Sequence, residues 1–66
     1  MTREEELKAY MRDSGVKIKE IGEYLNVNPK RISVALFRGL TKVQDGVIRN
    51  AVDAVAKQKI KDNQLF

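Results

Sequence analysis

The segment Val16–Arg38, with the sequence VKIKEIGEYLNVNPKRISVALFR, decides how this chain folds. It predicts two short helices, Ile18–Leu25 and Pro29–Arg38, because apolar side chains recur every three or four residues in both ranges. Only three residues separate the two ranges, and helices joined by so short a connection must cross steeply. The segment therefore predicts a tight, angled pair of helices.

The residues around the connection suit such a pair. Gly22 lies mid-helix, where glycine costs about 1 kcal/mol relative to alanine, so we expect the second helix to pass close to it. Gly22→Ala should then be tolerated and Gly22→Leu should be strongly destabilising. Asn26 stands where the backbone must enter the left-handed region, which asparagine tolerates. Val27 is expected to fill the core between the helices. Asn28 is a favoured N-cap, and Pro29 suits the first helical position.

A further helix is expected before this pair, from about Arg3 to Asp13. Thr2 and Glu5 have the spacing of a capping box, and Gly15 is well placed to end the helix in a left-handed cap. The apolar positions expected to face the core from these first three helices are Leu7, Tyr10, Met11, Ile18, Ile21, Leu25, Ile32, Ala35 and Leu36.

The last helix is expected to start near Thr41, to reach at least Val55 and to extend no further than about Ile60. Its inward stripe is expected to consist of Val43, Val47, Ala51, Ala54 and Val55. Ile48 and Val52 widen the apolar arc to about 180°, whereas a core-facing stripe needs only about 100°. The surplus fits either a contact with a second copy of the chain or a central place in a bundle.

These patterns predict an all-α fold, a compact four-helix bundle formed by residues 1–66 as a single domain. Residues 60–66 form a tail that is expected either to be disordered, to dock on the core, or to join a contact between two copies.

The composition limits the functions that the chain can have. Its 66 residues include no cysteine and no histidine, which removes disulfides, the commonest metal ligands and the commonest general base. So small a fold also has little room for a closed reaction pocket. We therefore expect no enzyme, no metal, no cofactor and no small-molecule ligand.

No apolar run approaches the roughly 18 residues of a membrane span, and residues 1–6 are too polar and acidic for a signal peptide. We therefore expect no membrane association. The expected location is the cytoplasm, in association with the nucleoid, for a protein of bacterial, phage or plasmid origin.

The net charge of +4 is unevenly distributed. Residues 24–44 contain four basic side chains and no acidic one, whereas the segments on either side are nearly balanced. A basic stretch is commonly just a solvated surface. The absence of acidic side chains from residues 24–44, however, favours a polyanionic partner.

The outward face of Pro29–Arg38 fits such a partner. At about 100° per residue, Lys30, Val34 and Phe37 lie opposite the core stripe, and Arg31 lies beside them. Cations with an exposed valine suit a DNA major groove, where lysine or arginine can bind guanine and an apolar side chain can contact a thymine methyl group. For Phe37 we favour an inward tilt against the last helix.

Phosphate contacts are expected around this helix, and they would position the protein without reading sequence. The backbone N–H groups near Asn28–Arg31 can meet a phosphate directly. The side chains expected to do so are Lys17, Lys19, Ser33, Arg38, Thr41 and Lys42.

About a third of the chain resembles the N-terminal headpiece of the lactose-repressor family. The resemblance covers Val16–Leu25, Val27, Ile32-Ser33 and Ala35-Leu36. It implies a helix-turn-helix in which the second helix is the DNA-recognition helix. It also implies base reading by Pro29, Lys30 and Val34 and phosphate binding by Asn28 and Ser33.

The sequence departs from that family in several ways. Val34 stands where arginine is common, Pro29 has no long side chain, and Lys17 stands where a capping threonine is usual. The hinge helix and the sugar-binding domain have no counterpart. The extra first helix is more similar to compact phage repressor and Cro-type domains, which implies a small stand-alone regulator.

The function expected from these observations is sequence-preferring binding of double-stranded DNA, as a transcriptional regulator. A homodimer through the last helix and the tail is expected, because one such module has a small footprint. The alternatives are an excisionase-like architectural DNA-binding factor, a protein–protein adaptor using the face of the last helix, and a plain helical hairpin without a DNA contact.

Overall fold

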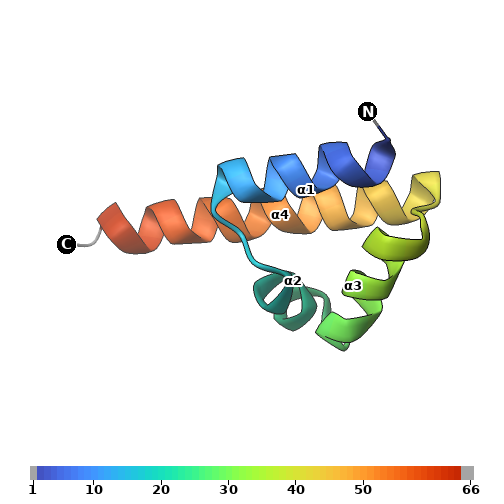
Figure 1. The fold of residues 1–66 in the computed structure, drawn as a ribbon. Helices are drawn as coiled ribbons and strands as arrows, with labels where there is room; N and C mark the ends of the chain where they lie inside the picture. Colours follow the sequence, from blue (N-terminus) through green and yellow to red (C-terminus); the bar gives the residue numbers. More distant parts are fainter. Residues whose placement is uncertain (1, 65–66) are drawn as a thin grey trace.

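The computed structural model describes residues 2–64, and it folds them into four α-helices joined by short connections (Figure 1). The helices are α1 (Arg3–Ser14), α2 (Ile18–Leu25), α3 (Pro29–Arg38) and α4 (Lys42–Gln64). The predicted all-α, four-helix class is confirmed. The helix α4 continues beyond the expected limit at Ile60, and the last two residues of the expected tail, Leu65 and Phe66, lie outside the described part of the chain.

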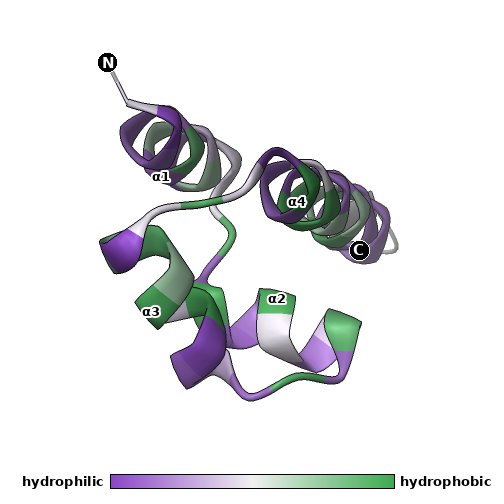
Figure 2. Ribbon diagram, turned by 90° about the vertical axis from the view of Figure 1, so that its right-hand side faces the viewer, coloured by the Kyte–Doolittle hydropathy of each residue, from purple (hydrophilic) through white to green (hydrophobic). Residues whose placement is uncertain are grey.

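The four helices form two layers. In the first layer α1 and α4 lie side by side and run in roughly the same direction, with the C-terminal part of α4 extending past the end of α1 (Figure 1). The second layer consists of α2 and α3, which pack on each other and lie on one side of the α1–α4 pair (Figure 2). Helix α2 packs against α4, and α3 packs against α1, whereas α3 and α4 are not in close contact.

The hydrophobic core lies between these layers. Its buried side chains are Leu7, Met11, Val16, Ile21, Ile32, Leu36, Leu40, Ile48, Ala51 and Val52. The stripes predicted for the first three helices are confirmed, with Tyr10, Ile18, Leu25 and Ala35 half-buried at their edges. Val16 and Leu40, which lie in connections, were not predicted to be buried, because helical spacing does not extend into a connection.

The predicted inward stripe of α4 is wrong at its N-terminal end. Ile48 and Val52 are buried, whereas Val43 and Val47 are 75% and 46% exposed. The reason is the position of the neighbouring helices, since α1 and α2 cover one side of α4 while α3 leaves the other side open. Part of the apolar surplus of α4 therefore faces solvent in this structure.

Local capping fixes where the helices begin and end. The Glu5 N–H donates to Thr2 Oγ1 at 3.2 Å at the start of α1, and Gly15 ends that helix with φ +69°. At the start of α4 the Gln44 N–H donates to Thr41 Oγ1, and the Thr41 N–H donates to Gln44 Oε1, both at 3.0 Å. This reciprocal pair is a capping box.

The first turn of α1 binds the connection between α3 and α4. Arg3 Nη1 donates to the Leu40 carbonyl oxygen at 2.9 Å, and the Leu40 N–H donates to Glu4 Oε2 at 2.8 Å. The Leu40 side chain is itself buried. Both backbone polar groups of Leu40 are thus satisfied by α1, which holds the C-terminal end of α3 in place.

Candidate nucleic-acid interface

The crossing between α2 and α3 is centred on Gly22. A Cβ atom built at this position would lie 2.8 Å from Pro29 Cγ and 2.9 Å from the Val27 carbonyl oxygen. Both distances are shorter than van der Waals contact, so even alanine requires a shift of the turn. The predicted close approach at Gly22 is confirmed, but the expectation that alanine is tolerated is wrong, because the backbone of the turn itself fills the space.

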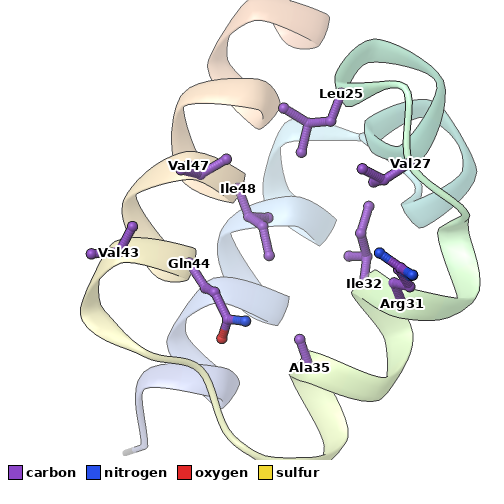
Figure 3. Close-up of a pocket in the computed structure, with 9 residues that line it drawn as sticks. All are labelled: Leu25, Val27, Arg31, Ile32, Ala35, Val43, Gln44, Val47 and Ile48. Atoms are coloured by element: carbon purple, nitrogen blue, oxygen red, sulfur yellow. The ribbon is translucent and has the colours of Figure 1, made fainter.

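The turn between α2 and α3 has the predicted backbone conformation at Asn26 but not the predicted side-chain packing at Val27. Asn26 adopts φ 57° and ψ 43° in the left-handed region. The Val27 N–H donates to the Gly22 carbonyl at 2.9 Å. The Val27 side chain is 39% exposed, so it does not fill the core between the helices. It borders an open groove between α3 and α4 instead (Figure 3).

The N-terminus of α3 is capped from within the chain. Asn28 Oδ1 accepts from the Lys30 N–H at 2.9 Å, and the Asn28 carbonyl accepts from the Arg31 N–H at 2.9 Å. Pro29 has no N–H to offer. Of the amides near Asn28–Arg31 that were expected to bind a phosphate, those of Lys30 and Arg31 are therefore already bonded within the chain, because a good N-cap uses the same groups.

The N-terminal half of α3 presents three of the four predicted base-reading side chains together. Lys30, Arg31 and Val34 line one shallow hollow with Asn28, a predicted phosphate ligand, and all four residues are exposed. Pro29 differs, because it is only half-exposed and its ring packs against Gly22. In this position Pro29 shapes the turn more than it offers a group to a partner.

Phe37 is the most exposed large apolar side chain among the described residues, at 88%. The favoured inward tilt against the last helix is therefore wrong. Leu36 and Leu40 occupy the core on either side of it, and α4 is not close enough to α3 to cover it. Val34 is 45% exposed on the same outward face. The face thus combines cations with two exposed apolar side chains, of which Phe37 is the more exposed.

The predicted phosphate-binding side chains are also exposed, and they surround α3 only in part. Lys17 and Ser33 line a common groove beside α3. Four further candidates are exposed without lining that groove or the hollow on α3, namely Lys19, Arg38, Thr41 and Lys42. The Thr41 hydroxyl already accepts from the Gln44 N–H in the cap of α4.

The start of α2 is better capped than the lysine at its N-cap suggests. A lysine side chain cannot accept a hydrogen bond, but Glu20 Oε1 accepts from the Lys17 backbone N–H at 3.0 Å. This is the carboxylate half of a capping box. The Lys17 ammonium group remains available to a partner.

The charged groups on this side of the molecule are not neutralised internally. The ion pairs among the described side chains join Arg12 to Asp13, Arg49 to Asp45 and Lys59 to Glu20. None of them involves the cations predicted to contact DNA, which are Lys17, Lys19, Lys30, Arg31, Arg38 and Lys42. A concentration of cations without carboxylate partners attracts polyanions.

Two cations near the site were not predicted from the sequence. Lys8 and Arg12, on α1, line the same groove as Lys17, Ser33 and Phe37. Their spacing of four residues was a usable signal, since it puts like charges on one face of a helix.

Comparison with known proteins identifies no relative of this chain. No protein-family model, curated protein or solved structure matches the chain. The similarity to the lactose-repressor headpiece therefore remains a prediction from the residues quoted above. None of the described helices has both the length and the apolar character needed to cross a bilayer.

Proposed function

We propose that this protein binds double-stranded DNA with a preference for sequence, using α2 and α3 as a helix-turn-helix and α3 as the recognition helix. One observation carries the proposal: the outward face of α3 combines cations that have no carboxylate partner with the exposed apolar side chains of Val34 and Phe37. A major groove can bind both kinds of side chain, because it offers acceptors to the cations and thymine methyl groups to the apolar side chains.

In this proposal the hollow on α3 reads the bases. Lys30 and Arg31 would donate to guanine O6 and N7, and Val34 would contact a thymine methyl group. Asn28 would use its carboxamide N–H on a phosphate, because its oxygen already accepts from the Lys30 N–H. Pro29 would set the angle at which α3 leaves the turn. The difference from the lactose-repressor headpiece at Val34 implies a different target sequence.

The proposed phosphate ligands flank the hollow. Exposed side chains on α2, on α3 and at the start of α4 would hold the two strands of the duplex, and they are Lys17, Lys19, Ser33, Arg38, Thr41 and Lys42. These contacts would fix the orientation of the protein and supply the affinity that is independent of sequence.

A salt series tests the proposal. Fluorescence anisotropy of a mixed-sequence duplex is measured with the wild-type protein, with Lys30→Ala/Arg31→Ala, and with Lys57→Ala/Lys61→Ala as a control of equal charge change on the exposed end of α4. Log affinity should fall with log salt by about 0.9 per phosphate contact. The α3 variant should bind much more weakly than the α4 control.

Two other results would contradict the proposal. Failure of the wild-type protein to bind at about 50 mM salt, where non-specific contacts are strong, would exclude DNA as the partner. Equal losses in the two variants would mean that only net charge matters and that α3 is not the recognition element. The first result would favour the adaptor alternative, in which a protein partner binds α4.

We further propose that two copies bind adjacent half-sites about one DNA turn apart, as a transcriptional regulator. The open groove between α3 and α4 supports an apolar contact, because it is bordered by the exposed side chains of Val27, Val43 and Val47 (Figure 3). Sedimentation of the protein alone and with a duplex carrying two half-sites tests this. A 1:1 complex at saturation would contradict it and would leave the binding of DNA by α3 unaffected.

A further inference from the structure

A second groove lies beside the recognition helix, on the side opposite the apolar groove of Figure 3. It runs between the C-terminal half of α1, the start of α2 and the C-terminal half of α3, and its apolar floor includes Met11 and Leu36. Ser33 and Phe37 of α3 form one wall. This groove therefore adjoins the face of α3 that is proposed to enter DNA.

The polar side chains at this groove are cations from outside the helix-turn-helix. Lys8 and Arg12 of α1 line it together with Lys17 at the start of α2, and no carboxylate lines it. The nearest acid partner is Asp13, whose Oδ1 lies 3.8 Å from Arg12 Nε, and both side chains of that pair are at least 74% exposed. So exposed and long a pair is weakly held, and Arg12 is free to bind a stronger anion.

Lys8 and Arg12 put two like charges on one face of α1. They are four residues apart and both are exposed, and like charges at this spacing destabilise a helix. Arg12 lies in the last turn, where the helix dipole favours a cation, whereas Lys8 lies too far from that turn to benefit from the dipole. An anion placed over the groove would remove the repulsion between the two cations.

We propose that α1 is a third DNA-binding element, in which Lys8 and Arg12 bind phosphates of the strand that borders the groove. The proposal rests on the proposed function. A helix lying in the major groove has a phosphate backbone on each side. The strand on the α1 side would then pass over Lys8, Arg12 and Lys17, beside the proposed phosphate ligand Ser33. Phe37 would face the groove of the duplex. The chain would thereby extend its footprint beyond that of the helix-turn-helix alone.

The test is the salt dependence of binding by Lys8→Gln/Arg12→Gln, beside the wild-type protein and Lys57→Gln/Lys61→Gln. Removing two phosphate contacts should lower the slope of log affinity against log salt by about 1.8. The loss of affinity should be the same for different duplex sequences, since phosphate contacts carry no sequence information. The α4 control should keep the wild-type slope. Thermal melts should show that the double variant is folded, with a melting temperature close to that of the wild type.

Each outcome has one meaning. A reduced slope in the α1 variant alone supports the proposal. A wild-type slope in the α1 variant, with wild-type protein that binds DNA, overturns the role of α1 and leaves the helix-turn-helix as the binding element. An equal reduction in both variants overturns it as well, because the effect is then one of net charge. Wild-type protein that does not bind at all overturns the proposed function and this inference together.

Discussion

The ring of Pro29 lies directly against the Cα atom of Gly22, so that a Cβ atom at position 22 would come within 2.8 Å of Pro29 Cγ. The Val27 carbonyl oxygen would lie 2.9 Å from that added Cβ atom. Because a backbone atom cannot rotate away as a side chain does, we expect Gly22→Ala to lower the free energy of unfolding by about 1–3 kcal/mol. Urea denaturation followed by circular dichroism measures this.

Gly46 provides the matched control. It also lies inside a helix, but a Cβ atom there would meet nothing within 4 Å. Gly46→Ala should therefore raise the free energy of unfolding by up to about 1 kcal/mol, the usual gain of alanine over glycine in a helix. If both variants were stabilised, Gly22 would not be the point of close approach.

Phe37 should matter for DNA and not for folding. Because its side chain is 88% exposed, Phe37→Ala should change the free energy of unfolding by no more than about 0.5 kcal/mol. The proposed function predicts that the same variant binds a duplex several-fold more weakly. Tyr24→Ala is the control, since Tyr24 is an exposed aromatic residue on α2 that borders α4 rather than the proposed DNA face. Equal affinity of the Phe37→Ala variant and the wild type would assign Phe37 to another partner.

Glu4 should contribute more to stability than the other acids of the first turn of α1. Its carboxylate accepts the Leu40 N–H at 2.8 Å, and Glu4→Ala leaves that N–H without its partner. A cost of about 1–2 kcal/mol is expected. Glu6→Ala removes a charge from the same turn with the same change in helix propensity, and Glu6 is exposed. Thermal or urea unfolding of the two variants separates the effect of the Glu4–Leu40 hydrogen bond from that of the helix dipole. Equal destabilisation by Glu4→Ala and Glu6→Ala would argue against a contribution from the hydrogen bond.

Glu20 should make stability depend on acid pH. Its carboxylate accepts from Lys59 Nζ at 2.8 Å and from the Lys17 N–H at 3.0 Å. The Lys59 hydrogen bond first, and the Lys17 backbone N–H second, hold the pKa of Glu20 below its ordinary value of 4.5. A lowered pKa in the folded state means that this contribution is present in full above about pH 4.5 and is lost as the pH falls through the folded-state pKa.

Glu20→Gln should therefore destabilise the protein at pH 7 by no more than about 1 kcal/mol, because the pair is partly exposed. The difference from the wild type should shrink as the pH falls below 4.5. Glu23→Gln, on the same helix and outside the ion pairs of the described residues, is the control. A difference between Glu20→Gln and wild type that stays constant down to acid pH would exclude the linkage.

The bounds of α2 and α3 could be predicted to the residue because the signals that set them are local. Asn26 ends α2 through its own backbone conformation, and Asn28 and Pro29 start α3 within a span of two residues. The need for a small residue at position 22 could also be predicted from the sequence. Whether alanine is small enough could not be predicted, because that depends on where the Val27 carbonyl points.

The packing of α4 could not be predicted, because two stripes satisfy helical spacing equally well. Val43 and Val47 define one stripe, and Ile48 and Val52 define the other. Only the positions of α1 and α2 decide that the second is buried. The exposure of Phe37 is of the same kind, since periodicity placed it on the outward face and gave no information on whether α4 comes close enough to cover it.

The proposed site could be predicted as a set of exposed side chains but not as a set of available hydrogen-bonding groups. Lys30, Arg31 and Val34 line a common hollow on the outward face of α3, as the spacing of about 100° per residue predicts. The amides at the start of α3 were identified by position alone. Which of them remain free depends on the rotamer of Asn28, and that side chain binds one of them.

Helix α3 is held at both ends, by the Gly22 contact at Pro29 and by the hydrogen bonds of α1 to Leu40. The conformational entropy of α3 is thus lost when the protein folds, and the proposed docking of α3 onto a duplex need not order it again. Preorganisation of this kind gives a calorimetric signature. The heat-capacity change on binding should match that of the apolar area buried between two rigid surfaces, without the larger value that accompanies folding on contact.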